Sequence, residues 1–220
     1  MEPEKGILLI NKPSGISSFG CIREMRKILG IKKMGHAGTL DPRAEGLLIV
    51  GVGEGTKKLS GFIGLDKVYR AVVRLGMSTD TSDLDGEVTR QCLVQSIKEK
   101  DVVSALNSMI GNHEYEVSPY SALKRNGKRL YEYVREGKKP PVVTRDMEVY
   151  SYTLFSIEPK DGFVDVTVEF HVKSGVYIRS LAVALGEKLA VPSVLAHLVR
   201  TAIGPFSLHD ATDLHLLTKK

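Results

Sequence analysis

A glycine-rich segment near the N-terminus holds the residues of this chain that are best suited to chemistry. It reads GHAGTLDP from Gly35 to Pro42, so glycines and a proline surround the single carboxylate of Asp41. Glycine lets the backbone approach a ligand closely, and proline fixes the chain direction, so Asp41 projects from a sharply turned loop. An Asp-Pro pair in such a loop is more often a turn or a cap than a catalytic site. A catalytic interpretation therefore needs support from elsewhere in the chain.

The elements that must position this loop follow from the pattern of apolar residues. Residues 6–10 form a short run typical of a strand, and residues 47–52 form a buried strand bounded by glycines. Between them, Ser17 or Ser18 can cap a helix that Gly30 ends, with apolar residues at positions 19, 22, 25, 28 and 29. The Asp41 loop is therefore expected between a helix and a buried strand.

The rest of the chain alternates between strand and helix patterns without a regular βαβ repeat. Strict alternation predicts strands at 67–75 and 164–172, and amphipathic spacing predicts a helix at 97–110. Further helices are expected at 178–189, at 193–199 after Pro192, and at 210–217. The fold class predicted is α+β, with a mixed sheet and one core.

One segment, residues 124–145, stands out by its positive charge and is called the arm below. Its glutamates are Glu132 and Glu136, and its prolines and glycines indicate an excursion from the sheet with one short helix at about 130–135. Two interpretations stay open, a solvated surface loop and an arm that binds phosphates. The basic residues of the arm are Lys124, Arg125, Lys128, Arg129, Arg135, Lys138, Lys139 and Arg145.

Composition narrows the function classes. The chain has 220 residues and a formal net charge of +5, a balance that suits a globular protein with an anionic partner. Cys21 and Cys92 are far apart and belong to no metal-binding motif, so reduced thiols and a cytoplasmic location are expected. No signal peptide or membrane span is indicated. No cofactor or metal motif is found either, and the acidic run at 80–86 lacks calcium-loop spacing and is interpreted as a solvent loop.

Five blocks of this sequence, in order, resemble the motifs of the TruB family of tRNA pseudouridine-55 synthases. The GHAGTLDP segment resembles that family's GHxGTLDP signature. Together the five blocks cover nearly the whole chain. The other blocks are NKPSG at 11–15 with Ser17 and Ser18, KVYRA at 67–71 with the TxTxDxxG pattern at 79–86, YSALK at 120–124 with LYE at 130–132, and SGVYIRSLA at 174–182 with HLVRT at 197–201.

The resemblance implies a pseudouridine synthase fold, with a mainly antiparallel mixed sheet flanked by helices and a basic insertion at about 115–147. It implies that Asp41 is the catalytic nucleophile on a uridine, and that Arg179 pairs with its carboxylate. Tyr69 would stack on the flipped base, although a phenol is a poor base near neutral pH. His36 would fill the space that the flipped nucleotide leaves.

The remaining roles implied by the resemblance concern RNA binding. Lys12 would pack beneath Tyr69, Leu198 would be an apolar wall of the base pocket, and Tyr177 belongs to the YIR motif. Lys124, Arg125, Lys128 and Arg129 would grip RNA. The expected partner is the T-arm of tRNA, bound by a monomer without cofactor, metal or membrane.

Family members usually continue into a C-terminal RNA-binding PUA domain, which we do not expect here because the catalytic motifs end close to Lys220. Two other functions are weighed. The first is the catalytic subunit of a guide-RNA pseudouridylation particle of the H/ACA type, which normally needs the PUA domain. The second is a catalytically silent RNA-binding or RNA-folding module, against which the intact Asp41, Tyr69 and Arg179 argue.

Overall fold

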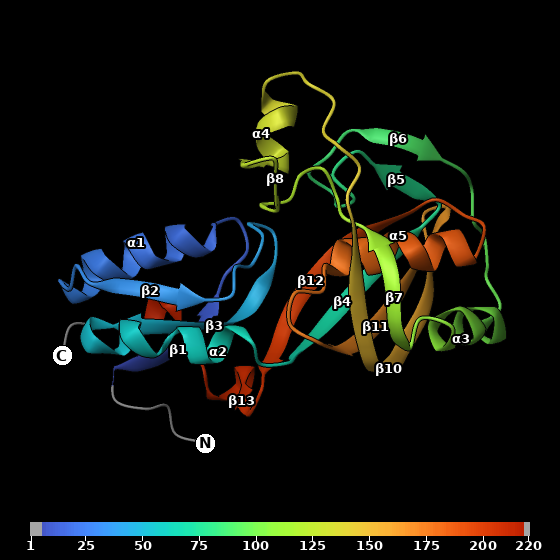
Figure 1. The fold of residues 1–220 in the computed structure, drawn as a ribbon. Coiled ribbons are helices and arrows are strands. Elements are labelled where there is room, and N and C mark those ends of the chain that lie inside the picture. The colour runs from blue at the N-terminus through green and yellow to red at the C-terminus, as the bar shows by residue number, and fades with distance from the viewer. Residues whose placement is uncertain (1–5, 218–220) are drawn as a thin grey trace. The chain divides into compact units, whose positions relative to one another are not determined.

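The computed structural model describes residues 6–217, which divide into two compact units (Figure 1). Within this range, unit 1 comprises residues 6–70, His171–Ser174 and residues 197–217, and unit 2 comprises Ala71–Phe170 and Gly175–Ala196. The chain passes from one unit to the other several times, and the strands at residues 67–75 and 193–203 contribute to both.

Unit 1 is built on a mixed sheet. Strand β3 (Glu45–Val52) pairs antiparallel with β1 (Ile7–Lys12) and with β2 (Met34–Ala37), and it pairs parallel with the end of β12 (Ser193–Ile203). The edges are short: β14 (Thr212–Asp213) runs parallel to β1, and β13 (Phe206–Ser207) runs antiparallel to β12. A 3-10 helix at Gly53–Lys58 and helix α2 (Ser60–Ile63) follow β3.

Helix α1 (Ser18–Leu29) covers part of this sheet and has the ends that the sequence predicts. Ser17 accepts a hydrogen bond from the Gly20 amide, and Gly30 ends the helix with a φ of 70°. The helix buries Ile22 and Met25 against β1 and β3 residues such as Ile10 and Leu48. Phe19 is an exception to the predicted apolar face, because its side chain is 56% exposed.

Unit 2 contains the strand order β4-β11-β10-β7 and two longer helices. The strands are β4 (Lys67–Leu75), β11 (Phe163–Val172), β10 (Thr144–Lys160) and β7 (Gly111–Glu116), and β7 pairs antiparallel with β10. Helix α5 (Ile178–Lys188) packs on β7 and on α3 (Glu99–Asn107), and α3 also contacts β10. A ribbon of β5 (Met77–Thr79) and β6 (Val88–Gln91) stands apart from this sheet.

Most elements expected from the sequence are confirmed. The alternating positions of β4 and of β11 bury one face of each strand, as the period of two predicts. The predicted helices at 97–110 and 178–189 exist with slightly shorter bounds. The α+β class with a mixed sheet is therefore confirmed. Among residues 6–217, no helix has the length and apolar content needed to cross a membrane.

Two predicted helices are wrong. Residues 193–199 belong to strand β12, because Val199 and Arg200 pair with Glu45 and Gly46 of β3. Residues 210–217 contain β14 and the 3-10 turn Leu214–Leu216 instead of an α-helix, and the 3-10 turn Leu208–Asp210 precedes β14. Strand pairing with Ile10 and Asn11 holds β14 extended, and Asn11 also donates to the Asp213 carboxylate over 2.7 Å. In both cases tertiary pairing outweighs local helix propensity.

The arm belongs to the excursion from the sheet that begins after β7 ends at Glu116 and finishes where β10 begins at Thr144, and residues 117–123, which precede the arm, are called the arm root. The arm contains a hairpin of β8 (Lys124–Arg125) and β9 (Lys128–Arg129), followed by helix α4 (Leu130–Arg135), so the predicted short helix is confirmed. In Figure 1 the hairpin and α4 project away from the strands of unit 2.

Candidate active site

The backbone around Asp41 is fixed by hydrogen bonds from segments that are distant in sequence. The Ser18 hydroxyl accepts from the Leu40 amide at 2.8 Å and donates to the Leu40 carbonyl at 3.1 Å. The Pro42 carbonyl accepts from the Gly15 amide at 2.9 Å, and the Asp41 carbonyl accepts from the Ala44 amide at 3.1 Å. Asp41 itself is half-buried. Its carboxylate therefore projects from a loop whose geometry is set before any substrate arrives.

Lys12 is the first of two buried cations that brace this loop. Its side chain is fully buried, and its ammonium donates to the carbonyls of Pro13, Ile16 and Pro42 at 2.8, 2.7 and 3.2 Å. Burial lowers the pKa of Lys12 below its ordinary value, while the neighbouring Cys21, Glu45 and Asp41 act in the opposite direction. Lys12 therefore holds the backbone before and after the Asp41 loop. Its packing beneath Tyr69 and a direct contact with RNA stay predictions.

Arg200 is the second buried cation, and the sequence reasoning gave it no role. Its side chain is 1% exposed, and it donates to the Leu47 carbonyl at 2.8 Å and to the Gly38 carbonyl at 3.1 Å. Its guanidinium lies 6.0 Å from the centre of the Tyr69 ring, a cation–π distance. Arg200 thus ties the Asp41 loop to β3 and to Tyr69. The place of Arg200 in the HLVRT block was the sequence signal that could have indicated a role for it.

Glycine is required where β12 approaches β3. At Gly46, with a φ of 102°, an added Cβ atom would collide with the backbone of Arg200. The close contact places Arg200 directly beside the strand that follows the Asp41 loop.

His36, Tyr69 and Leu198 also belong to unit 1. His36 lies on β2 opposite Val50, and its Nδ1 atom is buried without a hydrogen-bond partner among residues 6–217. Burial, and then the Arg200 charge, lower the pKa of His36 below its ordinary value. A neutral imidazole ring is thereby favoured. Tyr69 is 8% exposed, and Leu198 is half-buried on β12.

Arg179 lies in unit 2, at the start of α5, with 6% of its surface exposed. It donates to the Thr81 carbonyl at 3.0 Å and lies 3.6 Å from the Asp83 carboxylate. It also donates to the Ser118 hydroxyl and to the Tyr120 carbonyl, both at 3.4 Å. The arginine therefore sits where the 80–86 loop meets the root of the arm.

The solvent-loop interpretation of residues 80–86 is wrong. Thr81 donates to the Asp83 carboxylate at 2.6 Å, and Tyr120 donates to the Asp80 carboxylate at 2.5 Å. The hydrogen bond to Asp80 raises the pKa of Tyr120 to about 12, so this phenol stays protonated. The carboxylates are used to hold Arg179 and the arm root in place. The TxTxDxxG pattern was the signal that could have indicated this role.

Two expectations about these residues are not tested by the structure. The predicted pair of Asp41 and Arg179 joins residues of different units, and it stays a prediction. Tyr177 caps α5, with its amide 3.4 Å from the Met147 sulfur, and its contact with RNA is likewise a prediction.

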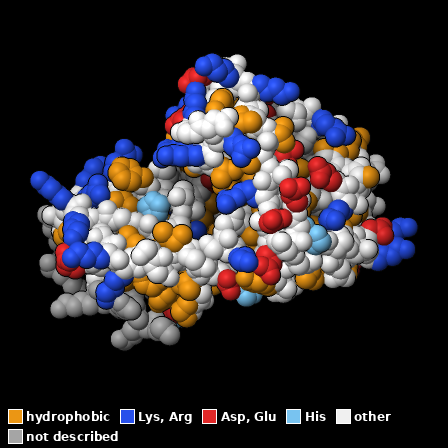
Figure 2. Space-filling view, in the orientation of Figure 1, with side chains coloured by type: hydrophobic (Ala, Val, Ile, Leu, Met, Phe, Trp, Pro, Cys, Tyr) orange, Lys and Arg blue, Asp and Glu red, His pale blue; other side chains and the backbone are white. Residues whose placement is uncertain are grey.

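The four arm cations proposed to grip RNA differ in how they are held. Lys128 pairs with Glu136 and lies 4.8 Å from the centre of the Tyr133 ring, and Arg129 donates to the Tyr131 hydroxyl at 2.8 Å. Lys124 and Arg125 are exposed on β8. Basic side chains gather over α4 and the adjoining hairpin in the space-filling view (Figure 2).

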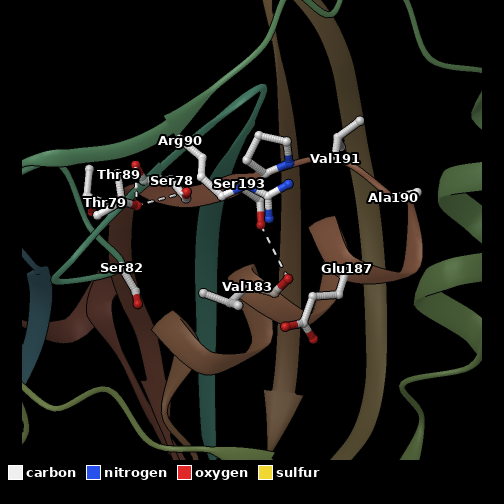
Figure 3. A pocket seen from close by; sticks show the side chains of 11 residues that line it. Ser78, Thr79, Ser82, Thr89, Arg90, Val183, Glu187, Ala190, Val191 and Ser193 are labelled. Atoms are coloured by element: carbon white, nitrogen blue, oxygen red, sulfur yellow. Dashed lines mark hydrogen bonds between the residues drawn. The ribbon is translucent and has the colours of Figure 1, made fainter.

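A separate pocket of about 430 Å³ lies in unit 2 (Figure 3). It is lined by hydroxyl side chains, by Arg90 and by Glu187, and none of the predicted site residues lines it. Ser193 donates to the Ala182 and Val183 carbonyls within it, at 2.9 and 3.3 Å. Among residues 6–217, no group of three or more His, Cys, Asp or Glu side chains could hold a metal ion.

The fold and the aspartate loop define a class, the pseudouridine synthases. The chain aligns with a solved structure of a Cbf5–Nop10–Gar1 complex at a TM-score of 0.73 and 26% identity. This alignment covers 96% of the present chain and 52% of that chain, so the protein spans about half the length of that relative. An H/ACA particle bound to a substrate RNA shares the fold at a TM-score of 0.69 and 24% identity.

Within this class, the chain belongs to the TruB family of pseudouridylate synthases. Residues 26–178 match the N-terminal domain of that family. The tRNA pseudouridine synthase B of Geobacillus thermodenitrificans is 38% identical over 220 residues, covering 98% of this chain and 72% of that protein. The corresponding enzyme of Oleidesulfovibrio alaskensis is 42% identical, covering 96% of this chain and 67% of that protein.

Proposed function

We propose that this protein converts uridine 55 in the T-arm of tRNA to pseudouridine, with Asp41 as the nucleophile. The observation that carries the proposal is the braced Asp41 loop, in a chain that is 38% to 42% identical to enzymes named tRNA pseudouridine synthase B. The proposal places the reaction in the cytoplasm and assigns it to the monomer.

The reaction breaks one bond and makes another within the same nucleotide. The Asp41 carboxylate bonds covalently to the nucleoside, and the bond between N1 and the ribose breaks. The base turns and rejoins the ribose through C5, and the bond to Asp41 breaks, so the carboxylate is regenerated. The proton on C5 then leaves, and N1 gains one, so atoms and charge balance without a co-reactant. This chemistry needs the carboxylate in one fixed position, and the hydrogen bonds to Leu40, Asp41 and Pro42 supply it.

The uridine must leave its stack before Asp41 can reach it, at a cost of a few kcal/mol. In the proposal, the Tyr69 ring stacks on the flipped base while Leu198 closes the apolar side of the pocket. The neutral His36 ring occupies the gap that the base leaves in the RNA. The lowered pKa of His36 supports this role, because an uncharged ring stacks between bases without desolvating a charge.

The arm supplies affinity for the RNA backbone in this proposal. Lys124 and Arg125 are exposed, and Lys128 and Arg129 lie on the partner strand of the same hairpin. Four cations on one two-stranded ribbon can neutralise several phosphates of an RNA backbone.

A second candidate is action within a guide-RNA particle, which the structural likeness to Cbf5 favours. The identity to that protein is 26%, against 38% to 42% for the tRNA enzymes, so tRNA is the preferred substrate.

The test is to incubate the purified protein with an unmodified tRNA transcript and to map every pseudouridine formed. Formation at position 55 without other components supports the proposal. Formation that needs a guide RNA and partner proteins would assign the second candidate instead. Tight tRNA binding with no conversion under either condition would make the protein a silent RNA-binding module.

A further inference from the structure

One face of helix α1 combines an exposed aromatic ring with two arginines. Phe19, Arg23 and Arg26 follow one another at spacings of four and three residues, so they share one side of the helix. Phe19 is 56% exposed, and the Arg26 guanidinium lies 5.6 Å from the centre of its ring. We call these three residues the α1 face.

Within the described part of the chain, the arginines of the α1 face form no ion pair with a carboxylate. Arg23 is exposed and has no ion pair or hydrogen bond with another residue of the 6–217 range, whereas the neighbouring Lys27 pairs with Glu24. Arg26 donates to the Met34 carbonyl at 2.9 Å, and its buried Nε atom has no partner within the same range. Among residues 6–217, neither guanidinium group is therefore paired with a carboxylate.

The position of the α1 face ties it to the proposed site. Ser18, which directly precedes Phe19, is bonded to both backbone groups of Leu40, the residue before Asp41. At the other end, Arg26 is bonded to Met34, two residues before His36 on the same strand. The α1 face therefore begins at the Asp41 loop and extends along the strand that carries His36.

We propose that the α1 face binds RNA nucleotides that flank the target uridine, with an unpaired base stacked on Phe19 and phosphates held by Arg23 and Arg26. A lone exposed phenylalanine is ordinary on a protein surface. An aromatic ring flanked by two arginines is instead the combination that single-stranded nucleic acids bind, since every base has a face that can stack. The net charge of +5 and the basic and apolar side chains over α1 agree with an anionic partner (Figure 2).

This inference rests on the proposed function, because it assumes that a uridine in RNA reaches Asp41. It adds a second RNA contact, in unit 1, to the arm of unit 2.

The test compares a double variant of the α1 face with a matched control. The test variant is Phe19→Ala with Arg23→Ser, and the control is Ile63→Ala with Lys100→Ser. Each loses one exposed apolar side chain and one exposed positive charge, and Ile63 is 53% exposed, close to the value for Phe19. Binding of an unmodified T-arm stem-loop is measured by filter retention over a salt series, and KM and kcat are measured by pseudouridine formation.

The test variant is expected to raise both Kd and KM about tenfold, with kcat within about twofold of wild type. The slope of log Kd against log salt should fall by about 0.7 to 0.9 for the lost Arg23 contact. The single variant Phe19→Tyr, with Arg23 unchanged, should keep the wild-type KM, because tyrosine also stacks. The control should match wild type in all three quantities.

Equal Kd and salt slope in the test variant and the control would overturn the inference, and so would a loss confined to kcat. Because Kd is measured separately from turnover, the two proposals can fail separately. Wild-type protein that binds the stem-loop but forms no pseudouridine overturns the proposed function. If the wild type is active and the α1 variant binds RNA normally, only the proposal for the α1 face is overturned. The α1 face would then be a candidate surface for a protein partner.

Discussion

The Asp41 loop and the arm carry the two halves of the proposed function, and they are held in opposite ways. The loop is braced by residues that are distant in sequence, among them Lys12, Ser18 and Arg200. The hairpin and helix of the arm are held mainly by local contacts, such as Tyr133 with the Arg125 carbonyl and Lys128 with Glu136. Chemistry at one carbon atom needs a carboxylate fixed before binding, whereas phosphate binding tolerates side chains that adjust.

The root of the arm departs from this contrast. Ser118 and Tyr120 contact Arg179, and Tyr120 also donates to Asp80. The arm is thus anchored firmly where it meets the proposed catalytic arginine, and locally organised beyond that point.

After the loss of Asp41 itself, the largest effect is expected from replacing Arg179. Its guanidinium reaches the Thr81 carbonyl, the Tyr120 carbonyl and the Asp83 carboxylate in different directions. A lysine cannot reproduce this fork, so Arg179→Lys should lower kcat about 100-fold, nearly as much as Arg179→Ala. Single-turnover rates of pseudouridine formation provide the measurement. Wild-type rates in the lysine variant would show that charge alone is needed there.

A smaller loss of kcat is expected when Arg200, the second buried cation that holds the Asp41 loop, is replaced. Arg200→Ala leaves the carbonyls of Leu47 and Gly38 without their donor and frees the Asp41 loop. We expect kcat to fall roughly 10- to 100-fold with little change in KM, because the carboxylate is misplaced by a fraction of an ångström. Arg200→Lys should recover part of the rate. A change in KM alone would mean that Arg200 acts in RNA binding instead.

The arm should show the reverse pattern. Lys124→Ser with Arg125→Ser is expected to raise KM about tenfold and to flatten the salt dependence of binding, with kcat nearly unchanged. Lys98→Ser with Lys100→Ser removes the same charge from exposed positions at and just before the start of α3 and serves as the control. A fall in kcat with normal binding would instead make the arm a lid over the flipped base.

The smallest effect concerns the two thiols, which lie in different units. Burial raises the pKa of Cys21 to about 11, so at pH 8 it stays protonated in the core of unit 1, whereas Cys92 is exposed. A thiol reagent at pH 8 should therefore label one cysteine in the native protein and two after unfolding. Rapid labelling of both in the native protein would show that the core around α1 opens readily.

Local patterns in the sequence predicted local structure well. The Ser17 cap and the alternation of β4 and β11 are confirmed, whereas the GHAGTLDP segment is a loop only after Ala37, because its first residues belong to β2. The roles of Arg200 and Asp83 depend on contacts with residues that are distant in sequence, which no local pattern encodes. The same limit explains the error at 193–199, where pairing with β3 decides the conformation.

The most direct measurement is the rate and binding of Asp41→Asn. The amide keeps the shape of the side chain and removes the nucleophile, so pseudouridine formation in an unmodified tRNA transcript should be abolished. The dissociation constant for the same transcript should stay within about threefold of wild type, because the anchors of the loop are backbone groups that the substitution leaves in place. Turnover within tenfold of wild type would contradict the central claim that Asp41 is the nucleophile.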